Sequence, residues 1–256
     1  MFFPCILCIS WWMNKTAQLS EWIKEAHSIA VLTGAGISTA SGIPDFRSAS
    51  GIYADERNVN VFDLNAFNRD PSIFYHFARE FYPKVRDAEP NIAHRVIASW
   101  NNATVITQNV DDYHQRAGSN PVYTVHGNHI FSSCPSCGAQ IETEELFPII
   151  GKGDVPHCVC GGVYKPNITF FGEMLPEYDW QESVKAMGEA DLVMVLGTSL
   201  QVHPAASLPG YRPWNARLVI INRDPTPMDS EAQLVIHEDI CEVMGEMTSK
   251  SSCVIE

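Results

Sequence analysis

The sequence is short of basic residues. Its 256 residues contain 17 Lys and Arg against 30 Asp and Glu, which gives a formal net charge of −13 at pH 7. Nucleic-acid binding depends on Lys and Arg side chains that neutralise phosphates, so we expect no direct nucleic-acid partner. A negatively charged surface suits basic, lysine-bearing protein partners instead.

A membrane span and a secretion signal are also missing. The apolar start of the chain, MFFPCILCISWW, is shorter than the roughly 20 residues that cross a bilayer. It lacks the positive region and the small-residue cleavage site of a signal peptide. We therefore expect a cytoplasmic protein with no membrane partner, in which the domain starts at Met13 and residues 1–12 are a non-native or disordered lead-in. The sequence gives no indication of the oligomeric state.

Because no secretion signal is found, disulfide bonds are not expected, and the cysteines need another explanation. Two close pairs stand about twenty residues apart: Cys134 with Cys137, and Cys158 with Cys160. This spacing predicts four thiolate ligands of one zinc ion in a zinc ribbon. Four thiolates leave no open coordination position, so we expect a structural rather than a catalytic metal. One irregularity is that the second pair encloses a single residue, where zinc ribbons usually have two.

The rest of the chain predicts an α/β fold. Apolar runs typical of buried parallel strands occur at 28–33, 103–109, 122–128, 190–199, 216–222 and 232–237. Helical patterns lie between several of them, and this alternation predicts a parallel sheet. Two insertions, a helical one at about 43–100 and the zinc ribbon at 129–166, are expected to form a smaller lobe. The larger lobe then comprises about 16–42, 101–128 and 167–245, within a single domain over 13–245.

Polar residues follow five of the predicted strands. In an open α/β sheet, ligands bind beyond the carboxyl ends of the strands, so these segments are expected to converge on one crevice. The segments are Gly34–Ser38, Gln108 and Asn109 with Asp111, His126–Asn128, Gly197–Ser199, and Asn222. Their convergence predicts a large ligand with several polar groups.

Taken alone, some of these segments are weak signals. Gly34 and Gly36 suggest a phosphate cradle, but the usual dinucleotide fingerprint needs a third glycine where Thr39 stands, so a plain strand-to-helix turn remains an alternative. His126 ends a predicted strand and is a candidate general base, although a lone histidine is more often structural. Residues 45–47, Asp-Phe-Arg, lie in a Gly- and Ser-rich loop, where a surface ion pair beside a packed aromatic ring is the alternative.

Several motifs occur together in a fixed order: GAGISTASGIPDFRS, TQNVDDYHQRAGS, HGN, the paired cysteines, NITFFGE and GTSLQVHPA. The chain resembles the sirtuin family of NAD-dependent protein deacylases, of the bacterial and archaeal single-domain type, over residues 16 to 245. The resemblance implies a Rossmann-like large lobe with a smaller zinc-ribbon and helical lobe. It also implies that NAD and an acetylated lysine of a protein or peptide enter one cleft from opposite sides.

The resemblance also implies a role for individual residues. His126 matches the general base, and Asn109 orients the reacting ribose. The expected NAD contacts are Gly34, Ala35, Gly36, Thr39, Asp45, Phe46, Arg47, Gln108, Asn109, Val110, Asp111, Gly197, Thr198, Ser199, Asn222, Asp239 and Ile240. The expected substrate contacts are Thr169, Phe171, Gly172, Glu173 and Val202, and the NITFFGE stretch has the alternation of an exposed strand that a peptide could extend.

Family members that prefer succinyl or malonyl groups resemble one another in a Tyr-x-x-Arg pair. Here Tyr75 is followed by Ala78 at that spacing, with Arg79 one position late, which favours acetyl or other neutral acyl groups. Three alternatives to a deacetylase remain: a mono-ADP-ribosyltransferase that uses the same NAD site, a zinc-dependent amidohydrolase, and a catalytically idle NAD-binding module. The second would need an open metal site and no NAD.

Overall fold

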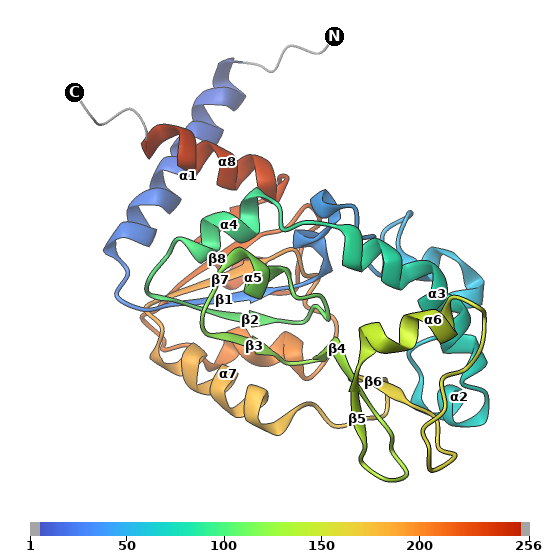
Figure 1. The fold of residues 1–256 in the computed structure, drawn as a ribbon. Coiled ribbons are helices and arrows are strands. Elements are labelled where there is room, and N and C mark those ends of the chain that lie inside the picture. The colour runs from blue at the N-terminus through green and yellow to red at the C-terminus, as the bar shows by residue number, and fades with distance from the viewer. Residues whose placement is uncertain (1–5, 252–256) are drawn as a thin grey trace.

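A six-stranded parallel sheet forms the centre of the molecule (Figure 1). The computed structural model describes residues 6–251, with side chains described from 15 to 248. The strands are β1 (Ile29–Thr33), β2 (Ala103–Thr107), β3 (Val122–Thr124), β7 (Leu192–Leu196), β8 (Arg217–Ile221) and β9 (Leu234–Ile236). They stand in the order β3-β2-β1-β7-β8-β9, and every neighbouring pair is parallel. The predicted strands and the parallel sheet are confirmed.

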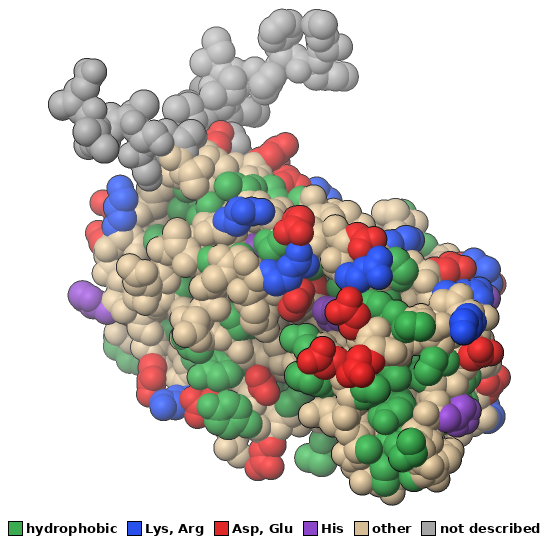
Figure 2. All heavy atoms as spheres, in the orientation of Figure 1, with side chains coloured by type: hydrophobic (Ala, Val, Ile, Leu, Met, Phe, Trp, Pro, Cys, Tyr) green, Lys and Arg blue, Asp and Glu red, His purple; other side chains and the backbone are tan. Residues whose placement is uncertain are grey.

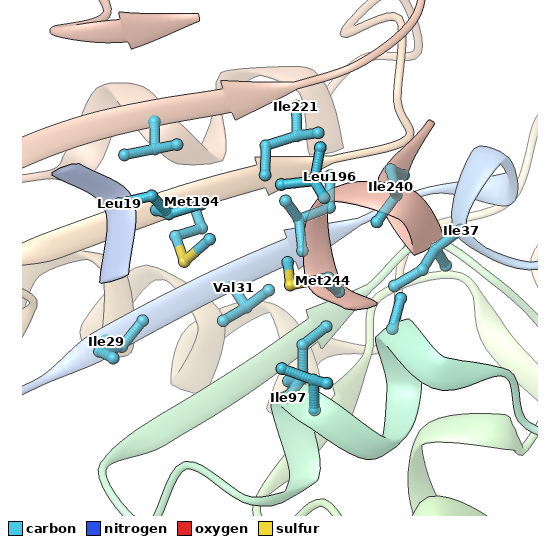
Figure 3. Packing of buried hydrophobic residues seen from close by; sticks show 14 of the residues in the cluster. Leu19, Ile29, Val31, Ile37, Ile97, Met194, Leu196, Ile221, Ile240 and Met244 are labelled. Carbon is cyan, nitrogen blue, oxygen red and sulfur yellow. The ribbon is translucent and has the colours of Figure 1, made fainter. Parts of the chain in front are cut away.

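Helices cover both faces of this sheet. In Figure 1, α1 (Ile6–Glu25), α4 (Ile92–Ala98) and α8 (Ile240–Ser251) lie on one face, and α7 (Glu177–Glu189) lies on the other. Successive residues of a strand point to opposite faces. Val31 therefore packs with Leu19 and Met244 on the first face (Figure 3), whereas Leu32 packs with Met187 on the second. Each such fully buried side chain contributes about 1.5–3 kcal/mol.

Most of the two insertions forms a smaller lobe beside the carboxyl edge of the sheet (Figure 1), but α4, which belongs to the expected insertion 43–100, packs on the sheet through Val96 and Ile97 instead. The smaller lobe contains α2 (Leu64–Arg69), α3 (Ser72–Asp87), α6 (Phe147–Ile150) and an antiparallel sheet in the order β5-β4-β6. These strands are β4 (Gly127–Ser133), β5 (Gln140–Glu142) and β6 (Lys165–Ile168). Its core is rich in aromatic rings, among them Phe62, Phe67, Phe74 and Phe170. The remaining α-helix, α5 (Tyr113–Ala117), follows β2.

Short three-ten helices fill several connections: Ala35–Ile37, Thr39–Ser41, Ile52–Ala54, Glu56–Asn58, Thr143–Leu146, Ala205–Tyr211 and Asp229–Glu231. Helix α1 runs without a break from Ile6, so residues 6–12, which were expected to be a lead-in, continue the helix that packs through Leu19. Residues 1–5 lie outside the described residues, and Met13 as the start of the domain stays a prediction. Within the described part of the chain, no helix is both long and apolar enough to cross a membrane.

Charged side chains of both signs are interspersed on the face of the molecule drawn in Figure 2. Lys and Arg side chains there lie next to Asp and Glu rather than in a continuous basic surface. This arrangement agrees with the deficit of basic residues in the sequence. The expected lack of a nucleic-acid partner stays a prediction.

Candidate active site

A cleft of about 500 Å³ lies beyond the carboxyl ends of the central strands, between the two lobes. Loops after β1, β2, β7 and β8 line it, together with His126 after β3. The five polar segments therefore meet, as their positions after strands predict. The predicted site residues that line the cleft are Gly34, Ala35, Gly36, Asp45, Phe46, Arg47, Gln108, Asn109, Val110, His126, Thr169, Phe171, Gly172, Glu173, Gly197, Thr198, Ser199, Val202 and Asn222.

Four predicted NAD contacts do not line this cleft, each for a visible reason. Thr39 donates a hydrogen bond from Oγ1 to the carbonyl oxygen of Gly36, 2.9 Å away. The carboxylate of Asp239 accepts hydrogen bonds from two amides at the start of α8, and Ile240 is buried in the core. Asp111 lies behind the cleft wall, in a smaller cavity. Their contact with NAD stays a prediction.

The loops after β1 and β7 touch each other through glycines. The amide of Gly36 donates to the carbonyl oxygen of Gly197 at 2.9 Å. A Cβ atom on Gly36 would stand 2.8 Å from the Cα atom of Gly197, so a side chain there would separate the two loops. Only three-ten turns follow β1, not an α-helix, and the amides of Gly34 and Gly36 already donate within the protein, so the loop offers a ligand neither a long helix dipole nor free glycine amides. Neither the fingerprint nor a plain strand-to-helix turn describes this segment.

The Asp45–Arg47 loop is held by its own side chains. Oδ1 of Asp45 accepts from the amides of Arg47 and Ser48 at 3.0 and 2.8 Å, so this carboxylate fixes a turn and does not form the surface ion pair considered from the sequence. The ring of Phe46 packs against Phe62, with centroids 5.8 Å apart. Arg47 reaches across the cleft and donates to Oγ of Ser199 at 3.4 Å. It is the only Lys or Arg among the residues that line the cleft.

A buried polar network stands behind Asn109. Oγ of Ser38 donates to Oδ2 of Asp111 at 2.9 Å and accepts from Nδ2 of Asn109 at 3.2 Å. Burial raises the pKa of Asp111 to about 6, against the opposing hydrogen bond from Ser38. The side cavity of about 40 Å³ that these residues line is otherwise apolar and adjoins the cleft. Ser38 ends the Gly34–Ser38 segment that was expected at the crevice, but no contact or role was predicted for its side chain.

The imidazole of His126 has a defined orientation. Nδ1 lies 3.0 Å from the carbonyl oxygen of Gln108, which can only accept, so Nδ1 carries the proton and Nε2 presents a lone pair. Burial lowers the pKa of His126, and the hydrogen bond to Gln108 opposes that shift only in part. The ring is therefore neutral at pH 7, as a general base requires. The next residue, Gly127, has φ +70°. Only glycine fits there, because a Cβ atom would stand 2.0 Å from the carbonyl oxygen of Asn167.

The small lobe contributes an apolar wall that the sequence did not indicate. Phe62, Ile168 and Phe170 line the cleft alongside the predicted Thr169 and Phe171. Rules about strand ends could not find Phe62, because it belongs to the helical insertion. The NITFFGE stretch is only partly a strand: β6 ends at Ile168, and Phe171 forms an isolated bridge with Asp63. The expected exposed strand is therefore shorter than its alternation predicted.

The four paired cysteines meet at the far end of the small lobe. Their Sγ atoms all lie within 4.8 Å of one another, and the pairs Cys134–Cys160 and Cys137–Cys158 stand at 3.5 and 3.6 Å. Tetrahedral zinc with Zn–S bonds of about 2.3 Å places its sulfurs about 3.8 Å apart, so the cluster is consistent with a structural zinc ion. The single residue between Cys158 and Cys160 does not prevent this, because the exposed Val159 loops outward.

Comparisons with known proteins agree with this geometry. The model of the Sir2 family matches residues 34–204. An NAD-dependent protein deacetylase of Thermotoga maritima is 41% identical over 234 residues, which cover 89% of this chain and 95% of that protein. An NAD-dependent protein deacetylase of Oceanobacillus iheyensis is 38% identical over 226 residues, covering 86% and 94%.

Solved structures match over nearly the whole chain. A structure of Sir2 with a p53 peptide and NAD+ superposes with a TM-score of 0.86 at 38% identity, and covers 93% of this chain and 99% of that one. A Sir2 histidine-to-alanine variant with deacetylated p53 peptide and 3′-O-acetyl ADP-ribose gives 0.87 at 39% identity, covering 92% and 98%. This chain belongs to the Sir2 family, the sirtuins.

Proposed function

We propose that this protein is an NAD-dependent protein lysine deacetylase. With NAD and one water as co-substrates, it removes acetyl groups from lysine side chains and yields nicotinamide, O-acetyl-ADP-ribose and free lysine. The observation that carries the proposal is the neutral His126, whose Nε2 has no partner among the described residues, in one cleft with the glycine loops and an apolar wall. Its relatives of similar length carry the same activity in their names.

The residues of the cleft fit an NAD molecule. Gly34 and Gly36 bring the loop after β1 close to the loop after β7 at the edge of the cleft, and Arg47 brings the one guanidinium among the lining residues, which can pair with the phosphates. The side cavity beside Asn109 and Asp111 has the polar end and apolar walls that a nicotinamide ring requires. NAD supplies a ribose carbon that the acetyl oxygen attacks as nicotinamide leaves. The substrate itself is therefore the nucleophile, and no protein side chain needs to be one.

The protein's own residues orient groups and move one proton. Asn109 is fixed by its bond to Ser38, so its amide oxygen has a set direction for a ribose hydroxyl. Nε2 of His126 takes a proton from a ribose hydroxyl, while the carbonyl oxygen of Gln108 stabilises the imidazolium that forms. The metal takes no part in this chemistry, because four thiolates leave no open position. The amidohydrolase alternative is disfavoured for that reason.

The protein offers few free backbone amides with which the lysine-bearing peptide could pair. In segment 169–173, the amides of Thr169, Phe170, Phe171 and Glu173 already donate within the described structure. Gly172 is exposed, and its amide has no acceptor among the described residues. We therefore expect substrate pairing at Gly172, which lines the cleft together with Val202, rather than along the whole stretch.

The acyl pocket suits a neutral group. The hydroxyl of Tyr75 donates to the carbonyl oxygen of Tyr164, and neither Tyr75 nor Arg79 lines the cleft. A succinyl carboxylate would meet Phe62, Ile168 and Phe170 without a cationic partner. Leaving a charged group unpaired costs more than the 1–3 kcal/mol of a neutral one. We therefore expect kcat/KM to be at least about tenfold higher for an acetyl peptide than for a succinyl peptide.

An acetyl-lysine peptide assay with and without NAD tests the function. Release of nicotinamide in equal amounts with free lysine supports it. Deacetylation without NAD would contradict it. Labelled NAD separates the mono-ADP-ribosyltransferase alternative, since label would then move onto protein while acetyl groups stay in place. No observation in the cleft favours that alternative.

Three further expectations belong to this proposal. A cytoplasmic location fits the four unbridged cysteines, since clustered cysteines are typically metal ligands in reducing compartments and disulfides in oxidising ones. Subcellular fractionation tests it. The domain limits of 13–245, with a large lobe over 16–42, 101–128 and 167–245, are tested by limited proteolysis of the intact chain; α4 and residues 168–170 depart from these lobe limits, because Val96 packs in the large-lobe core and Phe170 in the small-lobe core. Acetylated proteins or peptides as partners are tested by the assay above.

A further inference from the structure

A buried cation lies directly behind the cleft wall. Lys165 begins β6 and is 8% exposed, so its ammonium is removed from water. Nζ donates to the carbonyl oxygen of Ile168 at 2.8 Å and to that of Pro166 at 3.2 Å. It forms an ion pair with Oε2 of Glu173 at 2.8 Å. An ammonium has three N–H groups, and all three are used.

The same contacts close a ring through the cleft-lining segment. Oε2 of Glu173 also accepts from the amide of Phe170 at 2.7 Å, and the amide of Glu173 donates to the carbonyl oxygen of Phe170 at 3.0 Å. The ammonium of Lys165 lies 4.2 Å from the centroid of the Phe170 ring. Lys165 therefore joins the first residue of β6 to a turn that ends eight positions later in the chain.

This turn carries groups that face the cleft. Thr169, Phe171, Gly172 and Glu173 line it, and the amide of Thr169 donates to the main-chain oxygen of His126 at 2.8 Å. A shift of the turn would therefore move both the wall that a peptide meets and the residue that holds the base. The turn passes through Gly172 at φ +98°, a conformation that glycine adopts readily and other residues rarely.

Stability alone is a weak reason for a buried ion pair. Burial lowers the pKa of Lys165, and the pairing with Glu173 opposes this shift. Apolar side chains of similar volume often replace such pairs without loss of stability. The contacts of Lys165 instead fix positions: two carbonyl oxygens, one carboxylate and one ring are held around a single point.

We propose that Lys165 is a positioning residue for the acylated peptide. Its ion pair with Glu173 holds segment 168–173 in the conformation that accepts the substrate backbone and the acyl-lysine side chain. The residues assigned to NAD lie mostly in the loops after β1, β2, β7 and β8, outside this segment, although Ile168 also lines the side cavity assigned to the nicotinamide, so NAD is expected to depend less on the pair than the peptide does. The inference rests on the proposed function for its substrate, but the conformation of the segment can be measured without catalysis.

The first test compares Lys165→Met, Lys165→Arg and Lys152→Met by amide hydrogen exchange of the intact chain. Lys152 is an exposed lysine whose ammonium has no described partner, so it is the matched control. We expect exchange at Phe170 and Glu173 to accelerate about tenfold or more in Lys165→Met, to recover in part in Lys165→Arg, and to stay unchanged in Lys152→Met. Unchanged protection in Lys165→Met would overturn the proposal.

The second test separates the two substrates by initial-rate kinetics with an acetyl-lysine peptide. A misplaced binding wall can cost on the order of 100-fold, so we expect the KM for peptide to rise at least about tenfold in Lys165→Met. The KM for NAD is expected to stay within about twofold, and Lys165→Arg to restore part of the loss. Equal increases in both KM values, with a lower unfolding midpoint, would assign Lys165 to general stability and reject the proposal.

Glu173→Gln serves if Lys165→Met does not fold. It keeps an oxygen for the amide of Phe170 and removes only the charge, so a smaller change in the same direction is expected. Wild-type exchange rates in this variant would overturn the proposal. If the wild-type protein shows no NAD-dependent deacetylation, the proposed function fails, while the exchange experiment still decides whether Lys165 fixes the segment.

Discussion

Replacing His126 with Ala removes the proposed base and little else. The Thr169 amide bonds to the main-chain oxygen of residue 126, which the substitution keeps. The carbonyl oxygen of Gln108 loses its partner but faces the open cleft, where water can replace the imidazole. Nε2 of Gln108 still donates to Oγ1 of Thr198 at 3.0 Å, so the side of the cleft assigned to NAD keeps its shape.

The size of the effect follows from the role of a positioned base. Such a group is worth about 100- to 10,000-fold in rate, or about 2.7–5.4 kcal/mol in activation free energy. His126→Ala is therefore expected to lower kcat for deacetylation by that factor and to leave the Kd for NAD within about threefold. Nicotinamide leaves before the proton transfer. We therefore expect His126→Ala to lower the rate of exchange of labelled nicotinamide into NAD less than it lowers the rate of deacetylation.

The pH profile gives an independent check. Burial lowers the pKa of His126 below the ordinary value of about 6.5, so the fraction of neutral base already exceeds about 90% at pH 7.5. We expect kcat/KM to fall only below the lowered pKa, by about tenfold per pH unit, and this acid limb to vanish in His126→Ala.

The measurements are initial rates across pH and calorimetric NAD binding. His27→Ala is the control, because His27 is exposed and stands before β1, at the opposite end of the sheet. An unchanged kcat in His126→Ala, or an acid limb that begins above pH 6.5, would remove His126 from the mechanism.

Two further predictions concern stability. Zinc analysis is expected to find about one ion per chain. Cys134→Ser is expected to lower the unfolding midpoint and the zinc content together, since structural zinc contributes about 10–16 kcal/mol of apparent binding energy. Full activity of a metal-free preparation would refute this. Burial lowers the pKa of His94 to about 4. Between pH 6.5 and 4 the unfolded chain therefore binds more protons than the folded chain. The free energy of unfolding is expected to fall by about 1.4 kcal/mol per pH unit as pH drops through that window. The raised pKa of Asp111 has the opposite effect on the free energy of unfolding between pH 6 and 3.8. The contribution of His94 is therefore measured as the difference in pH slope between His94→Gln and the parent protein, by urea unfolding. The Gln oxygen can still accept from the Asn91 amide, and identical pH slopes in the two proteins would contradict the assignment.

The strands of the large lobe could be predicted because each is a short apolar run that ends in polar or glycine residues. Buried parallel strands are covered on both faces, as Val31 and Leu32 illustrate, so their sequences are continuously apolar and stand out. The zinc cluster could be predicted for a similar reason, since its ligand spacing is local. The end of β6 could not, because the bridge of Phe171 to Asp63 depends on a segment about a hundred residues away.

The sequence by itself determined the sheet, the four zinc ligands and the meeting of five polar segments at one edge, because apolar runs, cysteine spacing and strand direction are properties of short stretches of chain. Only the tertiary structure decided which nitrogen of His126 is free, that Ser38 joins Asn109 to Asp111, and that Phe62 and Lys165 support the cleft. Hydrogen-bond partners, burial and the pKa shifts that burial causes arise from residues far apart in sequence. They exist only once the chain has folded.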